Sequence, residues 1–162
     1  MMAKAKSRFS LAYKDLELDA LIENTPHKTL AIWSVDCAER VLHWFEAQFP
    51  EDVRPRQALA VCRAWIATGE FHMAIIRKAS LDAHAAARAV GADSPARSAA
   101  RAAGQAVATA HVATHAIGGS LYALQAVYRA ASLADADAAV TAERAWQTAH
   151  LRALGQTEND AG

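Results

Sequence analysis

The chain has 162 residues, of which 42 are alanine, and its 17 basic residues balance its 17 acidic residues. This length is sufficient for one domain with a hydrophobic core of its own. A net charge of zero argues against nucleic acid as the main partner, because nucleic-acid-binding domains usually carry an excess of positive charge. Alanine has the highest helix propensity of all residues, so the composition favours an all-α fold.

We expect a cytoplasmic protein that does not contact a membrane. The basic segment Met1–Phe9 lacks the apolar stretch of a secretory signal. No charge-free apolar run reaches the ~18 residues that a membrane-spanning helix needs. Cys37 and Cys62 both lie among apolar helical positions, and we interpret them as buried free thiols.

Capping residues, prolines and glycines divide the chain into about six or seven helices. The pairs Thr25-Pro26 and Ser94-Pro95 have the form of an N-cap followed by a first helical residue. Gly69 and Gly91 stand where a left-handed residue would close a helix, and Gly118-Gly119 is interpreted as a break between two helices. The predicted helices span residues 10–23, 26–48, 52–68 or 54–68, 70–90, 95–117, 120–131 and 135–155.

The loops between these helices are short, so consecutive helices should pack as antiparallel neighbours in a compact bundle. We expect residues 1–156 to form a single helical-bundle domain. Residues 157–162 are polar and end in glycine, and we expect them to form a flexible tail. The sequence does not specify an oligomeric state.

The polar stripe of the helix at 26–48 contains Asp36, Glu39, Arg40, His43 and Glu46. Two of its members, Asp36 and Arg40, stand one turn apart and are expected to pair locally. Acidic residues outnumber basic ones nine to three between residues 11 and 52, and basic residues outnumber acidic ones eight to three between 54 and 101. This asymmetry suits either ion pairs inside the bundle or a partner that recognises one face.

The helix predicted at 95–117 has an unusual surface. Small residues recur at four-residue intervals along one line: Ala96, Ala100, Gly104, Ala108 and Val112. Such a line lets a neighbouring helix approach to the low end of the interaxial range of about 8–10 Å. An overlapping line has arginines at one end and histidines at the other, with Gly104 and Ala108 leaving a shallow hollow between them: Arg97, Arg101, Gly104, Ala108, His111 and His115.

His111 and His115 have the spacing of four residues that metal-binding helices use. Two histidines are only half of a metal site, and the residues that would complete it lie on other predicted helices: Asp36, Glu39, His43 and His84. We prefer the interpretation that both histidines are structural and hydrogen-bonded, and keep a metal- or ligand-binding bundle as the alternative. The chain contains no recognisable catalytic motif, so we expect no enzymatic activity, no catalytic residues and no cofactor.

Several motifs in order resemble one bacterial family. The segment Trp33–Leu42 is similar to the opening W-x-x-D-C-A-E-R-V-L of the immunity protein 5-like family. The segments Phe49–Arg56, Ala85–Arg88 and Ala99–Val112 follow in the family's order, and His115 and the pair Tyr122-Ala123 complete the match. The resemblance covers roughly residues 30–128 and implies a small helical protein that neutralises a toxin in competition between bacteria.

The resemblance implies a protein partner, a toxin, and a set of candidate binding residues without an assigned chemical step. These are the charged and imidazole residues of the matching motifs: Asp36, Glu39, Arg40, Asp52, Arg54, Arg56, Arg88, Arg101, His111 and His115. A second interpretation of the same residues is a structural network in which arginines such as Arg56 and Arg101 pair with carboxylates across helices. Removing one member of a buried pair costs about 3–5 kcal/mol, because the other charge stays behind.

Overall fold

The computed structural model describes residues 9–12 and 14–162, and over these residues the chain folds into helices without any strand. The basic segment at residues 1–8 lies outside the described part. The all-α prediction is confirmed. Seven helices are present in the described residues: α1 (Leu16–Glu23), α2 (His27–Gln48), α3 (Arg54–Thr68), α4 (Met73–Ala89), α5 (Pro95–Ala108), α6 (His115–Ala130) and α7 (Ala136–Asp160).

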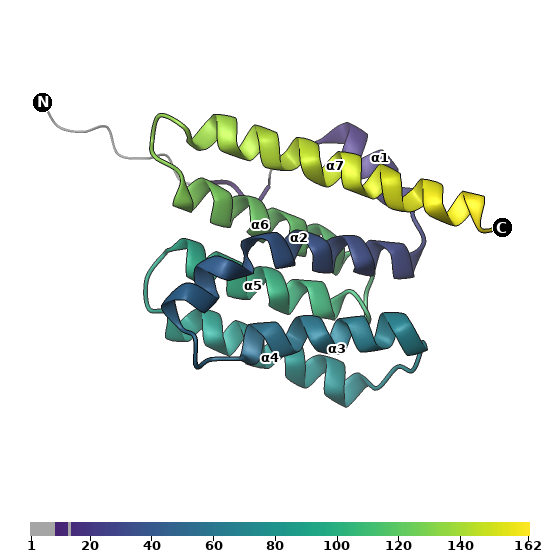
Figure 1. Cartoon of the computed structure of the whole chain (residues 1–162), viewed down its shortest axis with the longest axis horizontal. Coiled ribbons are helices and arrows are strands. Elements are labelled where there is room, and N and C mark those ends of the chain that lie inside the picture. Colours follow the sequence, from purple (N-terminus) through teal and green to yellow (C-terminus); the bar gives the residue numbers. More distant parts are fainter. Residues whose placement is uncertain (1–8, 13) are drawn as a thin grey trace, which may run out of the picture.

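Helix α5 lies in the middle of the bundle (Figure 1). Helices α2 and α6 lie along one side of it, and α3 and α4 lie along the other. Helix α7 covers α2 and α6 from outside. Helix α1 lies against α7, and Glu17 of α1 forms an ion pair with Arg152 of α7. Both faces of α5 are therefore covered by other helices.

The central position of α5 follows from its small side chains. Ala99, Ala100 and Ala103 have no exposed surface, and Gly104 is also buried. The space beside Gly104 is occupied by a side chain of α4, because a Cβ atom placed there would lie only 2.7 Å from His84 Nε2. Helix α4 thus packs directly on α5 at Gly104, in the middle of the predicted line of small residues.

Helix α2 contributes the large buried side chains that α5 lacks. Trp33, Leu42 and Phe45 are at most 1% exposed and belong to the same hydrophobic cluster as the alanines of α5. The indole Nε1 of Trp33 donates a hydrogen bond of 2.8 Å to the carbonyl oxygen of Gln147, which fixes α2 against α7. The core is thus formed by large side chains of one helix against the backbone of another.

Most of the predicted boundaries are found. Gly69 and Gly91 adopt φ angles of 71° and 77°, as a left-handed helix end requires, and Ser94 accepts a hydrogen bond from the amide of Arg97. Thr25 differs from the prediction: its hydroxyl donates to the carbonyl of Leu21, and it does not cap α2. Helix α7 continues to Asp160, so residues 157–160 are helical and not part of a separate tail.

The prediction of one helix over residues 95–117 is wrong. Helix α5 ends at Ala108, turns occupy residues 109–114, and α6 begins at His115. The turn contains Thr109, Val112 and Thr114, whose β-branched side chains fit poorly in a helix. The freed carbonyl of Thr109 contacts the imidazole of His27 on α2. His111 and His115 are consequently not presented on one face of one helix.

The predicted break at Gly118-Gly119 is also wrong, because both glycines lie inside α6. They are needed for close packing instead. A Cβ atom at Gly118 would lie 2.8 Å from the side-chain oxygen of Gln105, and one at Gly119 would overlap the hydroxyl of Ser34. Glycine here allows α6 to lie against α5 and α2.

Both cysteines are buried free thiols, as predicted. Burial raises the pKa of Cys62 to about 12 and raises that of Cys37 well above its usual value. None of the helices in the described residues is both long and apolar enough to cross a membrane.

Candidate functional site

The charged residues of α2 are paired with residues of α3 and α7. Each acid on the exposed side of α2 meets a cation or an imidazole from another helix, and the one arginine of α2 meets an acid. We call this group the α2 network, which consists of Asp36, Glu39, Arg40, Glu46, Arg56, Arg63, Glu143 and His150.

Arg40 pairs with α7 and not with Asp36, so the predicted local pair is wrong. Its guanidinium donates two hydrogen bonds of 2.7 and 3.0 Å to Glu143 and lies 3.9 Å above the ring of Trp146. Hydrogen bonding to Glu143 raises the pKa of Arg40. Asp36 instead lies 2.7 Å from Nε2 of His150 and 3.5 Å from the guanidinium of Arg63.

Arg56, in the first turn of α3, bridges two carboxylates of α2. It donates hydrogen bonds of 2.6 and 3.1 Å to Glu46 and a further one to Glu39, and these bonds raise its pKa. The predicted pairing of Arg56 with an acid of the bundle is therefore found. Arg54 pairs with Asp52, two residues earlier in the chain, and hydrogen bonds from Arg54 lower the pKa of that carboxyl. This pair stays within one segment and does not cross between helices.

Helix α4 is the least covered of the long helices that pack on α5. Only four of its 17 residues are buried. Around it, the apolar side chains of Phe71, Met73, Ile75 and Leu81 are between 43% and 54% exposed. Exposed apolar residues that gather on one side of a protein are typical of an interaction surface.

One stripe of α4 carries two arginines, a leucine and a histidine at spacings of four, three and four residues, which place them on the same face. Of this stripe, His84 packs on Gly104 of α5, and the neighbouring Ser80 donates a 2.9 Å hydrogen bond to the carbonyl oxygen of Gly104, whereas the other three residues are exposed. A hollow of about 330 Å³ opens between the helices at the end nearest α6. We call the whole region the α4–α5 surface, defined by Arg77, Leu81, His84, Arg88, Arg101, Ala108, His111 and His115.

His84 is held at the centre of this surface. Its ring packs on Gly104, and its Nδ1 is buried without a hydrogen-bond partner among the residues described. Burial lowers the pKa of His84, and the positive charges of Arg101, Arg88 and His115 lower it further. The charged groups that lower the pKa of His84 are thus all cationic or imidazole side chains.

Three arginines of the α4–α5 surface have no ionic partner in the described part of the chain. Arg77 and Arg88 are exposed, and Arg101 is half-buried. The acids nearest in sequence are already paired, Asp82 with Lys78 and Asp93 with Arg97. The predicted pairing of Arg101 with a carboxylate across helices is thus not found.

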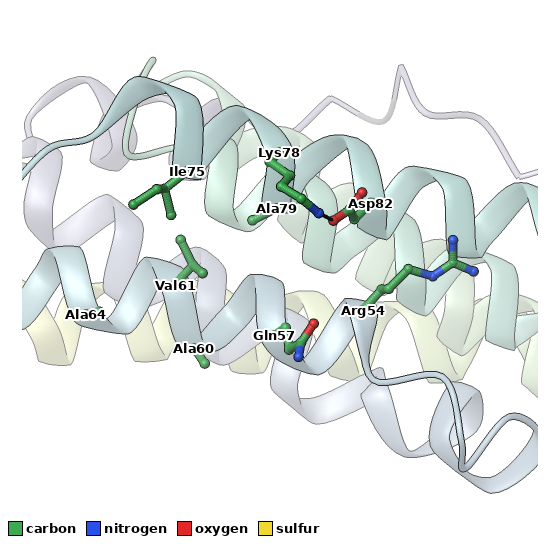
Figure 2. Close-up of a pocket in the computed structure, with 9 residues that line it drawn as sticks. All are labelled: Arg54, Gln57, Ala60, Val61, Ala64, Ile75, Lys78, Ala79 and Asp82. Atoms are coloured by element: carbon green, nitrogen blue, oxygen red, sulfur yellow. Dashed lines mark hydrogen bonds and ion pairs between the residues drawn. The ribbon is translucent and has the colours of Figure 1, made fainter.

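A larger groove, of about 470 Å³, separates α4 from α3 (Figure 2). Val61 and Ile75 face each other across it. Its charged residues are satisfied, because Lys78 pairs with Asp82 and Arg54 pairs with Asp52. The two grooves beside α4 therefore differ: the charges of the α3–α4 groove are neutralised, whereas the hollow between α4 and α5 is lined by Arg77, which has no ionic partner in the described residues.

The candidate metal ligands do not converge. Over residues 9–12 and 14–162, no group of three or more His, Cys, Asp or Glu side chains could hold a metal ion. The Nδ1 of His115 lies 2.8 Å from the side-chain oxygen of Gln105, and His111 stacks on Phe71. His43 is exposed, and its ring makes a tilted contact with that of its neighbour Trp44. Each histidine thus has its own local contact.

Sequence analysis overlooked partners on both surfaces. Glu143 and His150 lie on α7, and no local pattern indicates that they reach α2. Arg77 and Leu81 were detectable, because their spacing to His84 and Arg88 is helical and mixes charged with apolar residues on one face. Of these four residues, only Arg88 belongs to the family motifs.

Comparison with known proteins identifies a family. The sequence model of the family described as "Imm-5 like putative immunity protein" matches residues 20–154. This range extends beyond the predicted resemblance at both ends, into α1 and α7. No curated protein and no solved structure matches the chain.

Proposed function

The chain belongs to the Imm-5 like immunity protein family, and we propose on this basis that it protects its own cell by binding a protein toxin directly. Family membership is the observation that carries the proposal. It supports a protein partner as the general kind of ligand. That this partner is a toxin, and that binding neutralises it, are the parts that we propose beyond family membership.

Direct binding without chemistry suits the surfaces described above. A stable protein–protein interface buries about 1,200–2,000 Å² in total and is anchored by arginine and aromatic or other apolar side chains. Such residues are exposed together around α4, where Leu81 is 54% and Phe71 is 43% exposed and Arg77 has no carboxylate partner in the described residues. The two thiols are buried and protonated at neutral pH, which makes them unsuitable as nucleophiles.

The proposal is tested by competition between siblings. The gene for this chain is deleted in its native host, and the deletion strain is grown in contact with wild-type cells. We expect the deletion strain to be killed, and a plasmid copy of the chain to restore its survival. Equal survival of the deletion strain with and without the plasmid, under conditions in which the host kills other strains, would contradict immunity.

Stoichiometry distinguishes binding from enzymatic protection. The plasmid copy is placed under graded expression, and its level is compared with survival. A binding protein protects only when its amount approaches that of the incoming toxin, so survival should rise steeply at a threshold. Full protection at trace expression would indicate that the chain acts catalytically.

A further inference from the structure

We infer that the α4–α5 surface is the toxin-binding face, and that it accepts an acidic polypeptide segment with an apolar side chain between its carboxylates. This inference rests on the proposed function, because it names the surface and the chemistry of the same interaction. It is carried by three arginines without ionic partners, by the exposed apolar side chain between two of them, and by the hollow beside α5.

The charges define the chemistry of the partner. Arg77, Arg88 and Arg101 have no carboxylate within the described chain, whereas the arginines at the other side of the bundle do. A guanidinium is suited to bind a carboxylate through two parallel hydrogen bonds. A partner with Asp or Glu side chains would therefore supply the carboxylates that these arginines lack within the described chain.

The spacing of the arginines defines the length of the partner segment. Arg77 and Arg88 are separated by 11 positions of α4, which corresponds to about 16 Å along the helix axis. Leu81 lies on the same stripe between them and is 54% exposed. A segment of about three helical turns would carry carboxylates near both ends and an apolar side chain between them.

The hollow provides a place for the apolar side chain. It has a volume of about 330 Å³ and is lined by Met73, Ile76 and Leu81 on the α4 side and by Ala108 on the α5 side. The small side chain of Ala108 leaves this space open. An apolar side chain of the partner buried in this hollow, with charged residues at its rim, would match the apolar core and polar rim of a usual protein–protein interface.

Other surfaces fit this role less well. The groove between α3 and α4 is larger, but Lys78 and Arg54 beside it are already neutralised. The α2 network is paired internally in the same way. A nucleic acid would also attract the arginines, but the exposed Leu81 at the centre of the stripe offers nothing to a phosphate backbone.

The first test uses the sibling competition assay with matched double variants. Arg77→Glu/Arg88→Glu reverses two charges of the surface, and Lys14→Glu/Lys28→Glu reverses two exposed charges elsewhere that have no ionic partner among the described residues. Both variants are first compared with the wild type by thermal unfolding. We expect the first to lose protection and the second to keep it.

The outcomes separate this inference from the proposed function. If the wild-type chain itself gives no protection, the proposed function fails. If the wild type and a folded Arg77→Glu/Arg88→Glu variant protect equally, the function stands and the α4–α5 surface is not the binding face. If the first variant unfolds, Leu81→Lys provides the same test with one exposed residue, and full protection by it counts against the inference.

The second test measures the chemistry directly on the purified chain. The probe is a fluorescent helical peptide with glutamates 11 positions apart and leucines between them, and the controls are the same peptide with lysines and a short DNA duplex. We expect only the glutamate peptide to bind, with affinity that falls with added salt and drops about tenfold or more in Arg77→Glu/Arg88→Glu. Tighter binding of the DNA, or equal binding of the lysine peptide, would overturn the assignment to an acidic polypeptide.

Discussion

The two sides of this bundle use arginine differently. On the α2 side, Arg40 and Arg56 each donate paired hydrogen bonds to carboxylates of a neighbouring helix. On the α4 side, Arg77 and Arg88 project from a helix with few buried residues and have no such acid in the described chain. The family motif includes residues from both sides, so membership in a motif does not reveal which role a residue has.

This contrast shows how a protein of zero net charge retains a positive face. Three acids of α2, Asp36, Glu39 and Glu46, pair with arginines of α3 and with His150 of α7. The excess of basic residues between 54 and 101 is then neutralised only in part. The remainder is located on α4 and α5, where it is available to a partner.

The largest expected difference between the sides concerns packing. Trp33→Ala should lower the free energy of unfolding by about 3–5 kcal/mol, because the indole is fully buried and bonded to α7. Leu81→Ala should change it by less than about 0.5 kcal/mol, because that side chain is half exposed. Urea unfolding followed by circular dichroism measures both. A cost of several kcal/mol for Leu81→Ala would mean that α4 belongs to the core.

A smaller difference concerns the arginines themselves. Arg40→Ala should destabilise the fold by about 1 kcal/mol, because it removes a partly exposed ion pair with Glu143 and the contact with Trp146. Arg88→Ala removes no ion pair and should be close to neutral. Thermal unfolding of the two variants in parallel measures the difference. Equal destabilisation by both would end the distinction between a structural and an available arginine.

The smallest effect is a pH dependence centred on His84. Burial and the charges of Arg101, Arg88 and His115 lower its pKa, so the folded protein excludes a proton that the unfolded chain binds below its ordinary pKa of 6.5. His84 thus contributes stability above pH 6.5 that is lost as the pH falls toward the lowered pKa. The slope of this loss cannot exceed the ~1.4 kcal/mol per pH unit that one proton allows. His84→Gln should flatten the stability profile between those pH values; parallel profiles would refute the assignment.

The helices were largely predictable because their ends are marked locally. Gly69, Gly91 and Ser94 act at the helix ends as their residue types imply. A wrong boundary was predicted where a residue type can have either of two structural roles, as glycine can when it ends a helix or allows close packing. Gly118-Gly119 was interpreted as a break, but these glycines serve close packing against Gln105 and Ser34, which sequence spacing does not reveal.

The candidate site was less predictable, because pairing depends on tertiary packing. Residues of the same motif, Glu39 and Arg40, pair with different helices, α3 and α7. The sequence predicts that Arg56 pairs with a carboxylate across helices, and the structure identifies Glu39 and Glu46 as its partners. The absence of ionic partners for Arg77 and Arg88 depends on where the acids of other helices lie, which the sequence does not show.

Because α5 lies at the centre of the bundle, the residues that stabilise the fold are separate from the residues that are available to a partner. Enlarging any of its buried alanines disturbs several helices at once, since α2, α4 and α6 all pack against it. Helix α4 packs inward with Ile76 and three alanines and exposes Arg77, Leu81 and Arg88, so substitutions at these exposed positions leave the interior intact. Under the proposed function, an immunity protein built in this way can acquire specificity for a new toxin by altering its outer helix, without rebuilding its interior.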